Sequence, residues 1–143
     1  MYGGSNLRTR MKIRPDIFLF ADTHFGHRKI VEYQYRTEDF EELIVKNWNS
    51  VVKPRDVVLH LGDLALTNKL HTQKYSLRLN GEKYLVLGNH DDASETWYRD
   101  CGFTVIPPCL TYYKDKFGNK TRIALTHEPI DPLPENWWNT LVS

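Results

Sequence analysis

Cysteine is scarce in this sequence, and the chain has no long apolar run. Its 2 cysteines among 143 residues are too few for a disulfide framework or for a zinc site built from thiolates. We interpret Cys101 and Cys109 as small apolar fillers, which fits a reducing cytoplasm. Apolar runs such as Val57 to Leu61 are far shorter than the roughly 20 residues needed to cross a bilayer. The sequence therefore predicts a cytoplasmic protein without a membrane partner.

An excess of charge of one sign is also missing. The 19 basic and 18 acidic residues leave a net charge of +1, and no long run of one sign indicates a nucleic-acid partner. Hydrophobic residues make up 41% and charged residues 26%, as in ordinary globular domains. The first ten residues show no hydrophobic period. We expect residues 1–10 to form a flexible tail and residues 11–143 to form a single domain.

Short apolar runs alternate with helical patterns, which is typical of an α/β fold. We expect a helix capped by Thr37, with a buried stripe of Phe40, Leu43, Ile44, Trp48 and Val51. A short helix should follow a Ser94 cap, and a weaker helical pattern covers 68–79. Strands are expected at 16–21, buried on both faces, and at 57–61, 83–87, 110–113 and 121–126, the last two joined in a hairpin by Gly118-Asn119.

Polar side chains with metal-ligand chemistry follow four of these strands. Asp22-Thr23-His24 follows the first, Gly62-Asp63 the second, Gly88-Asn89-His90-Asp91 the third and His127 the last. Ligands of open α/β sheets bind beyond the carboxyl ends of the strands. We therefore expect these residues to meet at one edge, although they lie about a hundred residues apart in the sequence.

Carboxylates, an amide oxygen and imidazoles without a thiolate suit Mn, Fe, Zn or Mg. Asp22 and His24 are two residues apart, so on an extended strand end they can hold one ion from the same side. Asp63 has two oxygens and can bridge two ions. A pair of metals about 3.5–4 Å apart is suited to phosphate-ester hydrolysis. In that site His90 can contact the phosphate or protonate the leaving oxygen, and Asp91 can orient the His90 ring.

The remaining histidines have competing explanations. His27 lies near Asp22 and His24 in the sequence, so it is a candidate for substrate or metal binding, but a loop histidine bonded to backbone explains it equally well. His60 lies within an expected strand and is explained by packing. His71 lies in a polar helix and is explained by contact with solvent.

The order D-x-H, GD, GNHD and a later histidine resembles the calcineurin-like metallophosphoesterase family. The DTHFGH segment at residues 22–27 is similar to that of a small bacterial and phage subgroup, and the resemblance spans roughly residues 16–139. It implies a layered αββα sandwich with two divalent metal ions, Mn favoured. It also implies these roles: Asp22 and His24 bind one metal, Asp63 bridges, Asn89 and His127 bind the second, and His90 and Asp91 serve catalysis.

Family members continue past a Trp-containing segment into a Gly-His-x-His motif, where this chain reads Thr140-Leu141-Val142-Ser143. The resemblance implies a fold truncated at the C-terminus, with one protein ligand fewer at each metal. We expect hydrolysis of a small phosphomonoester or phosphodiester, with a nucleotide as the first candidate substrate. The alternative is a non-catalytic module that binds metal or a phosphate-bearing ligand. The sequence favours no particular oligomeric state.

Overall fold

The computed structural model describes residues 17–29, 31 and 36–128. The expected tail at residues 1–10 and the ending at residues 140–143 lie outside the described residues. Of the helices in the described part of the chain, none has the length and apolarity that a membrane span requires.

The centre of the fold is a parallel sheet of four strands in the order β1-β2-β3-β4. Its strands are β1 (Phe18–Phe20), β2 (Val57–His60), β3 (Glu82–Leu85) and β4 (Thr104–Val105). Phe20 pairs with His60, and His60 pairs with Leu85. The first three strands therefore end in one row, which confirms the expected shared edge. The two-residue β4 was not predicted, because so short a run carries no period.

β1 is the outer strand of this sheet. Phe18 and Phe20 pack against the core cluster on the helical side, whereas Leu19 is 52% exposed. The prediction of a first strand buried on both faces is therefore wrong. Successive side chains of a strand point to opposite faces, so an edge strand can bury one set and expose the other.

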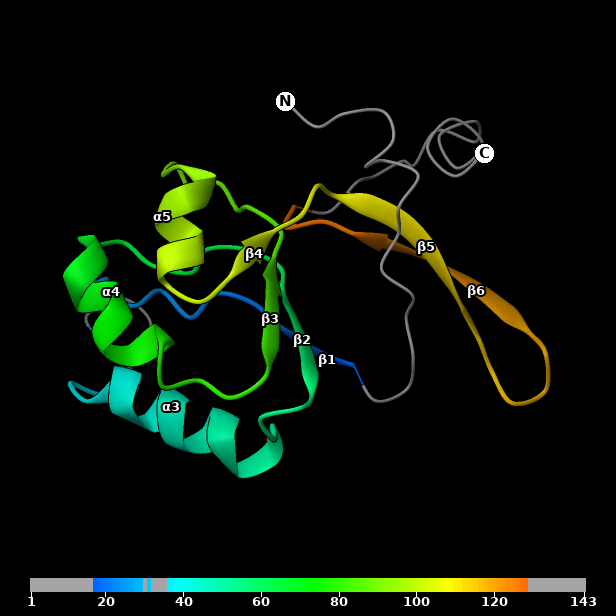
Figure 1. Ribbon diagram of the computed structural model, residues 1–143, viewed down its shortest axis with the longest axis horizontal. Helices are drawn as coiled ribbons and strands as arrows, with labels where there is room; N and C mark the ends of the chain where they lie inside the picture. Colours follow the sequence, from blue (N-terminus) through cyan, green and yellow to red (C-terminus); the bar gives the residue numbers. More distant parts are fainter. Residues whose placement is uncertain (1–16, 30, 32–35, 129–143) are drawn as a thin grey trace.

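Three helices, α3 (Phe40–Val51), α4 (Lys69–Ser76) and α5 (Glu95–Asp100), lie on one side of the parallel sheet (Figure 1). The side chains of Asn68 and Ser94 accept hydrogen bonds from the first turns of α4 and α5, so the predicted Ser94 cap is confirmed. The N-cap of α3 is Asp39. The predicted Thr37 cap is wrong, because Thr37 contributes its backbone carbonyl, which accepts from Phe40 N.

The buried face of α3 differs from the predicted stripe. Leu43 is 39% and Val51 54% exposed, so both predictions of burial are wrong. Phe40 and Trp48 are buried as predicted, and the helix also buries Glu41 and Val45. Glu41 faces the neighbouring loop, where its carboxylate accepts from Gly26 N and Arg28.

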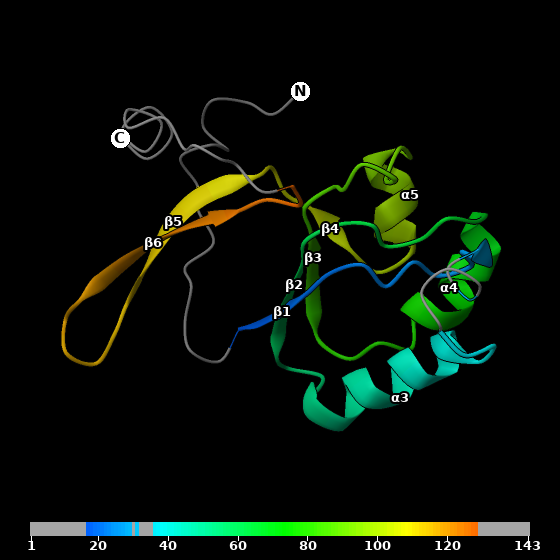
Figure 2. The ribbon, with the colours of Figure 1, turned by 180° about the vertical axis from the view of Figure 1, so that it is seen from behind.

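The predicted hairpin is confirmed as β5 (Cys109–Lys114) paired antiparallel with β6 (Lys120–Leu125). It lies on the other side of the parallel sheet from the helices (Figures 1 and 2). A small core of Leu59, Val86 and Leu125 joins the hairpin to that sheet. The described residues thus stack a helical layer, a parallel sheet and a second, two-stranded sheet.

Candidate metal centre

The loops after β1, β2, β3 and β6 bring five predicted ligands together around the carboxylate of Asp63. Asp63 Oδ2 lies 3.6 Å from His24 Nε2 and 3.3 Å from His127 Nε2. Asp22 Oδ1 lies 3.8 Å from His24 Nε2 and 4.0 Å from His127 Nδ1. Asn89 Oδ1 lies 2.9 Å from His127 Nε2. Residues separated by up to a hundred positions therefore form one cluster, with Asp63 in its middle.

The backbone is strained at three of these residues. Asp22, His24 and Asp63 have φ angles of 58°, 52° and 57°, in the left-handed region that non-glycine residues rarely adopt. Each such residue costs about 1–3 kcal/mol and persists only where its surroundings fix it. The two loops fix one another, because Asp22 N donates to Gly62 O at 3.0 Å and His24 N donates to Asp63 O at 3.1 Å. Among the described residues, the non-glycine residues with such φ angles are all candidate ligands, which indicates a functional site.

Two glycines allow the loops to approach closely. A Cβ on Gly88 would lie 2.5 Å from both the N and the Oδ1 of Asp63. A Cβ on Gly62 would lie 2.7 Å from His127 Nδ1, and Gly62 also has a φ of 109°. Side chains at either position would push the predicted ligands apart, as the GD and GNHD patterns suggested.

The tautomer of a neutral His127 ring follows from its neighbours. Nδ1 lies 2.8 Å from the carbonyl oxygen of Leu61, which can only accept, so Nδ1 carries the proton. The lone pair of Nε2 therefore faces Asp63 and Asn89. A backbone carbonyl that fixes the tautomer in this way is the usual partner of a metal-binding histidine.

The donor set of this cluster fits a divalent cation. The Asn89 Oδ1, the lone pair of His127 Nε2 and the Asp63 carboxylate are all acceptors, and they lie against one another. A divalent cation between these atoms would satisfy all three acceptors. A proton on Nε2, or the Asn89 amide turned to place Nδ2 at 2.9 Å from Nε2, would satisfy part of the same arrangement. One ligand atom each from Asp22, Asp63 and His127 also lies within 4.8 Å of the other two.

Asp91 has a different place from the predicted one. Its Oδ2 accepts from Asp63 N at 2.7 Å and Gly88 N at 2.8 Å, and its Oδ1 accepts from Leu64 N at 3.0 Å. The expectation that Asp91 orients the His90 ring is corrected, because backbone amides occupy both of its oxygens. Burial raises the pKa of Asp91 above its ordinary value in spite of these three donors. Asp91 therefore holds the backbone of Asp63 in place.

His90 and His27 lie at the open side of the cluster. His90 is exposed, its backbone N donates to Asp63 Oδ1 at 3.0 Å, and its ring lies edge-on to His24 with centroids 5.9 Å apart. His27 Nδ1 lies 3.0 Å from His24 Nδ1, so the contact that defines the His27 ring is another histidine rather than the backbone. Burial lowers the pKa of both His24 and His27; at His24 it outweighs the nearby charge of Asp63, and at His27 it is assisted by the nearby His90.

The chain matches a known protein family. The family model described as calcineurin-like phosphoesterase matches residues 15–141, nearly the whole chain. The chain belongs to this family. Its members are generally hydrolases that bind divalent metal ions, and the α/β arrangement fits the predicted calcineurin-like sandwich.

Two relatives are similar to part of this chain. An uncharacterized protein of Methanocaldococcus jannaschii is 42% identical over 85 residues, which are 55% of this chain and 48% of that protein. The gene 66 protein of Mycobacterium phage L5 is 35% identical over 77 residues, 50% of this chain and 37% of that protein. The matched stretches thus cover less than half of each of these relatives.

A solved structure is also similar to this chain. The crystal structure of a protein of unknown function from Aquifex aeolicus superimposes with a TM-score of 0.61 at 30% identity. The match covers 86% of the present chain and 66% of the Aquifex protein.

Two supporting residues of the candidate metal centre were not recognised from the sequence. The ring of His60 is buried, as packing predicted, but it also accepts from Gly62 N at Nδ1 and contacts Thr23 Oγ1 at 3.1 Å through Nε2. Burial lowers the pKa of His60 to about 3, so the ring is neutral. Arg36 donates to the carbonyls of Asp22 and Thr23, each at 2.8 Å. No sequence pattern distinguishes such an arginine from scattered surface charges.

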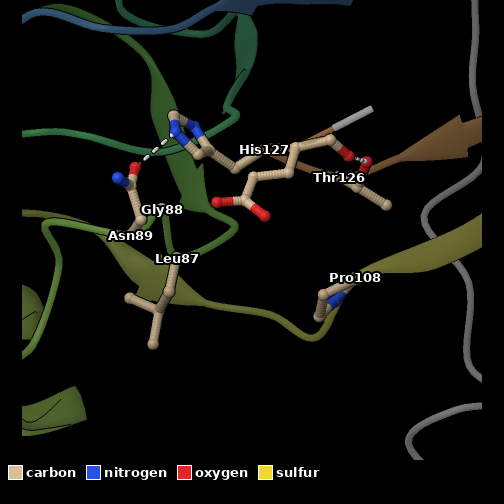
Figure 3. Close-up of a pocket in the computed structure, with 7 residues that line it drawn as sticks. Leu87, Gly88, Asn89, Pro108, Thr126 and His127 are labelled. Atoms are coloured by element: carbon tan, nitrogen blue, oxygen red, sulfur yellow. Dashed lines mark hydrogen bonds between the residues drawn. The ribbon is translucent and has the colours of Figure 1, made fainter. Parts of the chain in front are cut away.

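A cavity of about 400 Å³ opens beside Asn89 and His127. Its other walls come from the end of β3, the approach to β5 and the end of β6, and the residues concerned are Leu87, Gly88, Pro108, Thr126 and Glu128 (Figure 3). The cavity thus combines apolar side chains with two of the predicted metal ligands, in the size range of small-molecule sites.

Proposed function

We propose that this chain hydrolyses a small phosphomonoester or phosphodiester with the help of two divalent metal ions, Mn²⁺ favoured. The observation that carries the proposal is the convergence of His24 and His127 on one oxygen of Asp63, at 3.6 and 3.3 Å. A carboxylate oxygen close to two imidazole nitrogens from different loops is the arrangement expected of a bridging ligand.

The proposed ligand sets follow from this geometry. Asp22 and His24 would hold one ion together with Asp63, and Asn89 and His127 would hold the other on the opposite side of Asp63. When bound, such ions polarise a phosphoryl oxygen and make water acidic enough to attack phosphorus near neutral pH. The family resemblance assigns the same five residues.

His90 is the proposed general acid. Its ring is exposed and lies beside His24, while its attachment to Asp63 is through the backbone amide. The ring therefore remains free to donate a proton to the leaving oxygen. His27, held against His24, is placed to bind a phosphoryl oxygen through its other nitrogen.

The organic part of the ester would occupy the cavity beside Asn89 and His127. Leu87 and Pro108 offer apolar contact there, and Thr126 and Glu128 bring polar groups. This mixture suits a small leaving group with one apolar face. A nucleotide remains the first candidate substrate class.

The test compares the native protein, stripped of metal, with its Asp63→Asn variant. Metal binding and release of p-nitrophenolate from mono- and diester substrates are followed as Mn²⁺ is added. We expect Asp63→Asn to lose more metal than any other single change, because it removes charge from both ions. Asp100→Asn is the matched control, since Asp100 forms an exposed ion pair with Lys69.

Two outcomes would contradict parts of the proposal. An unchanged metal-to-protein ratio in Asp63→Asn would remove Asp63 from the bridging role. Native protein that binds metal but releases no p-nitrophenolate from either substrate, and hydrolyses no nucleotide, would contradict hydrolysis. It would favour the alternative of a metal-binding or phosphate-binding module.

A further inference from the structure

A second buried carboxylate lies near the candidate metal centre without reaching it. Glu41, in the first turn of α3, is 3% exposed although it is ionisable. Its Oε2 accepts from Gly26 N at 2.9 Å and lies 3.3 Å from His71 Nε2, and its Oε1 accepts from Arg28. Burying an unpaired carboxylate is costly, so these partners are what allows Glu41 to be buried.

Through its partners, Glu41 connects α3 to two other segments of the chain. Gly26 and Arg28 belong to the segment that follows β1, and His71 belongs to α4. Figures 1 and 2 show that segment, in blue, running from the sheet toward α4. An apolar side chain would suffice for packing, as Val45 and Trp48 show on the same face of α3. The presence of a carboxylate at position 41 is therefore explained by its hydrogen bonds to the loop after β1.

That loop carries two predicted metal ligands on strained backbone. On its inner side, His24 N and Phe25 N donate to the carbonyls of Asp63 and Leu64. On its outer side, Glu41 binds the amide of Gly26, two residues after His24. Gly26 itself has a φ of 77°, and a Cβ there would lie 2.5 Å from Thr67. The loop is thus held from both sides immediately after His24.

We propose that Glu41 is a positioning residue of the metal centre, which anchors the Asp22–Arg28 loop so that His24 faces Asp63 and His27 faces His24. The part of this inference that concerns metal affinity rests on the proposed function. Glu41 touches neither of the two histidines that it positions. Carboxylates that support metal ligands from behind typically change metal affinity about 10- to 100-fold when they are replaced.

The test replaces Glu41 by glutamine, which keeps its size and removes its charge. All three groups around Glu41 can donate, so an amide nitrogen in that place would oppose at least one donor. Glu42→Gln is the matched control, because Glu42 is the next residue of the same helix and forms an exposed ion pair with Arg78. Mn²⁺ affinity, the ratio of kcat to KM and the exchange rate of the Gly26 amide are measured in native protein and both variants.

We expect Glu41→Gln to weaken Mn²⁺ binding by about 10- to 100-fold and to speed exchange of the Gly26 amide, while Glu42→Gln resembles the native protein. If Glu41→Gln does not fold, Arg28→Gln is used instead, because the Arg28 side chain is 52% exposed and its loss weakens the same anchor. It should change affinity and exchange in the same direction, by a smaller factor.

The inference is overturned if the folded Glu41 or Arg28 variant binds Mn²⁺ as tightly as Glu42→Gln, whatever its stability. Native protein that binds no Mn²⁺ would refute the proposed function instead. The role of Glu41 in anchoring the loop would then be tested by the exchange rate of the Gly26 amide alone. An unchanged exchange rate in Glu41→Gln would overturn that role.

Discussion

Replacement of Asp91 by asparagine tests whether this carboxylate builds the site or takes part in the reaction. Asp91 Oδ2 accepts two backbone amides and Oδ1 accepts one. An asparagine would keep its oxygen at the Oδ2 position, where it can accept from Asp63 N and Gly88 N. Its NH₂ group would then lie against Leu64 N. The NH₂ group and Leu64 N, both hydrogen-bond donors, would then face each other, and Leu64 is 0% exposed.

The expected magnitude follows from this geometry. A buried donor left without a partner costs about 1–3 kcal/mol. The two bonds that remain lose the assistance of a negative charge, which makes such bonds roughly twice as strong as neutral ones. Together we expect Asp91→Asn to lower the free energy of unfolding by about 2–4 kcal/mol. Because Asp63 N is one of the three donors, Mn²⁺ affinity should also fall, by about 10- to 100-fold.

Urea unfolding, Mn²⁺ titration and amide exchange at Leu64 measure these effects. Asp92→Asn is the control, since Asp92 is the exposed neighbour of Asp91 in the sequence. If Asp91→Asn keeps native stability and metal affinity but loses turnover, Asp91 acts on the reacting groups and the positioning argument is refuted.

Two further predictions concern the same groups. His90→Asn should keep both metals, because the bond from residue 90 to Asp63 comes from the backbone, and should lower turnover by roughly 10²–10⁴; equal loss of metal and rate would make His90 a ligand. Burial alone would raise the pKa of Glu41, but the hydrogen bonds from Arg28, His71 and the Gly26 amide outweigh it and lower the pKa. Stability from Glu41 should therefore be present above the unfolded pKa of about 4.3 and be lost as pH falls through the lower folded pKa. Between pH 7 and pH 3, the urea midpoint of Glu41→Gln should fall less than that of the native protein. An equal fall in both proteins would contradict this.

The sequence predicted the elements whose signal is local. Apolar runs located β1, β2, β3 and the hairpin, and the polar residues that follow them located the site, because parallel strands end at a common edge. The side of α3 that is buried was not predictable in the same way. Glu41 is buried by partners on two other segments, and a helical period cannot show them. The role of Asp91 was missed for a related reason, since backbone amides leave no trace in the sequence.

Two buried carboxylates outside the candidate ligand set, Asp91 and Glu41, explain how the strained candidate ligands can be held in place. Asp22, His24 and Asp63 each adopt a left-handed backbone at a cost of about 1–3 kcal/mol. Metal binding alone would be an inefficient means of enforcing this, because the affinity for the ions would be reduced by the same amount. Asp91 instead binds the amide of Asp63, and Glu41 binds the amide that follows the His24–Phe25 pair. Neither carboxylate needs to be a ligand. Each accepts backbone N–H groups of the loops that carry ligands, so the cost of the strained geometry is met during folding, before any ion or substrate binds.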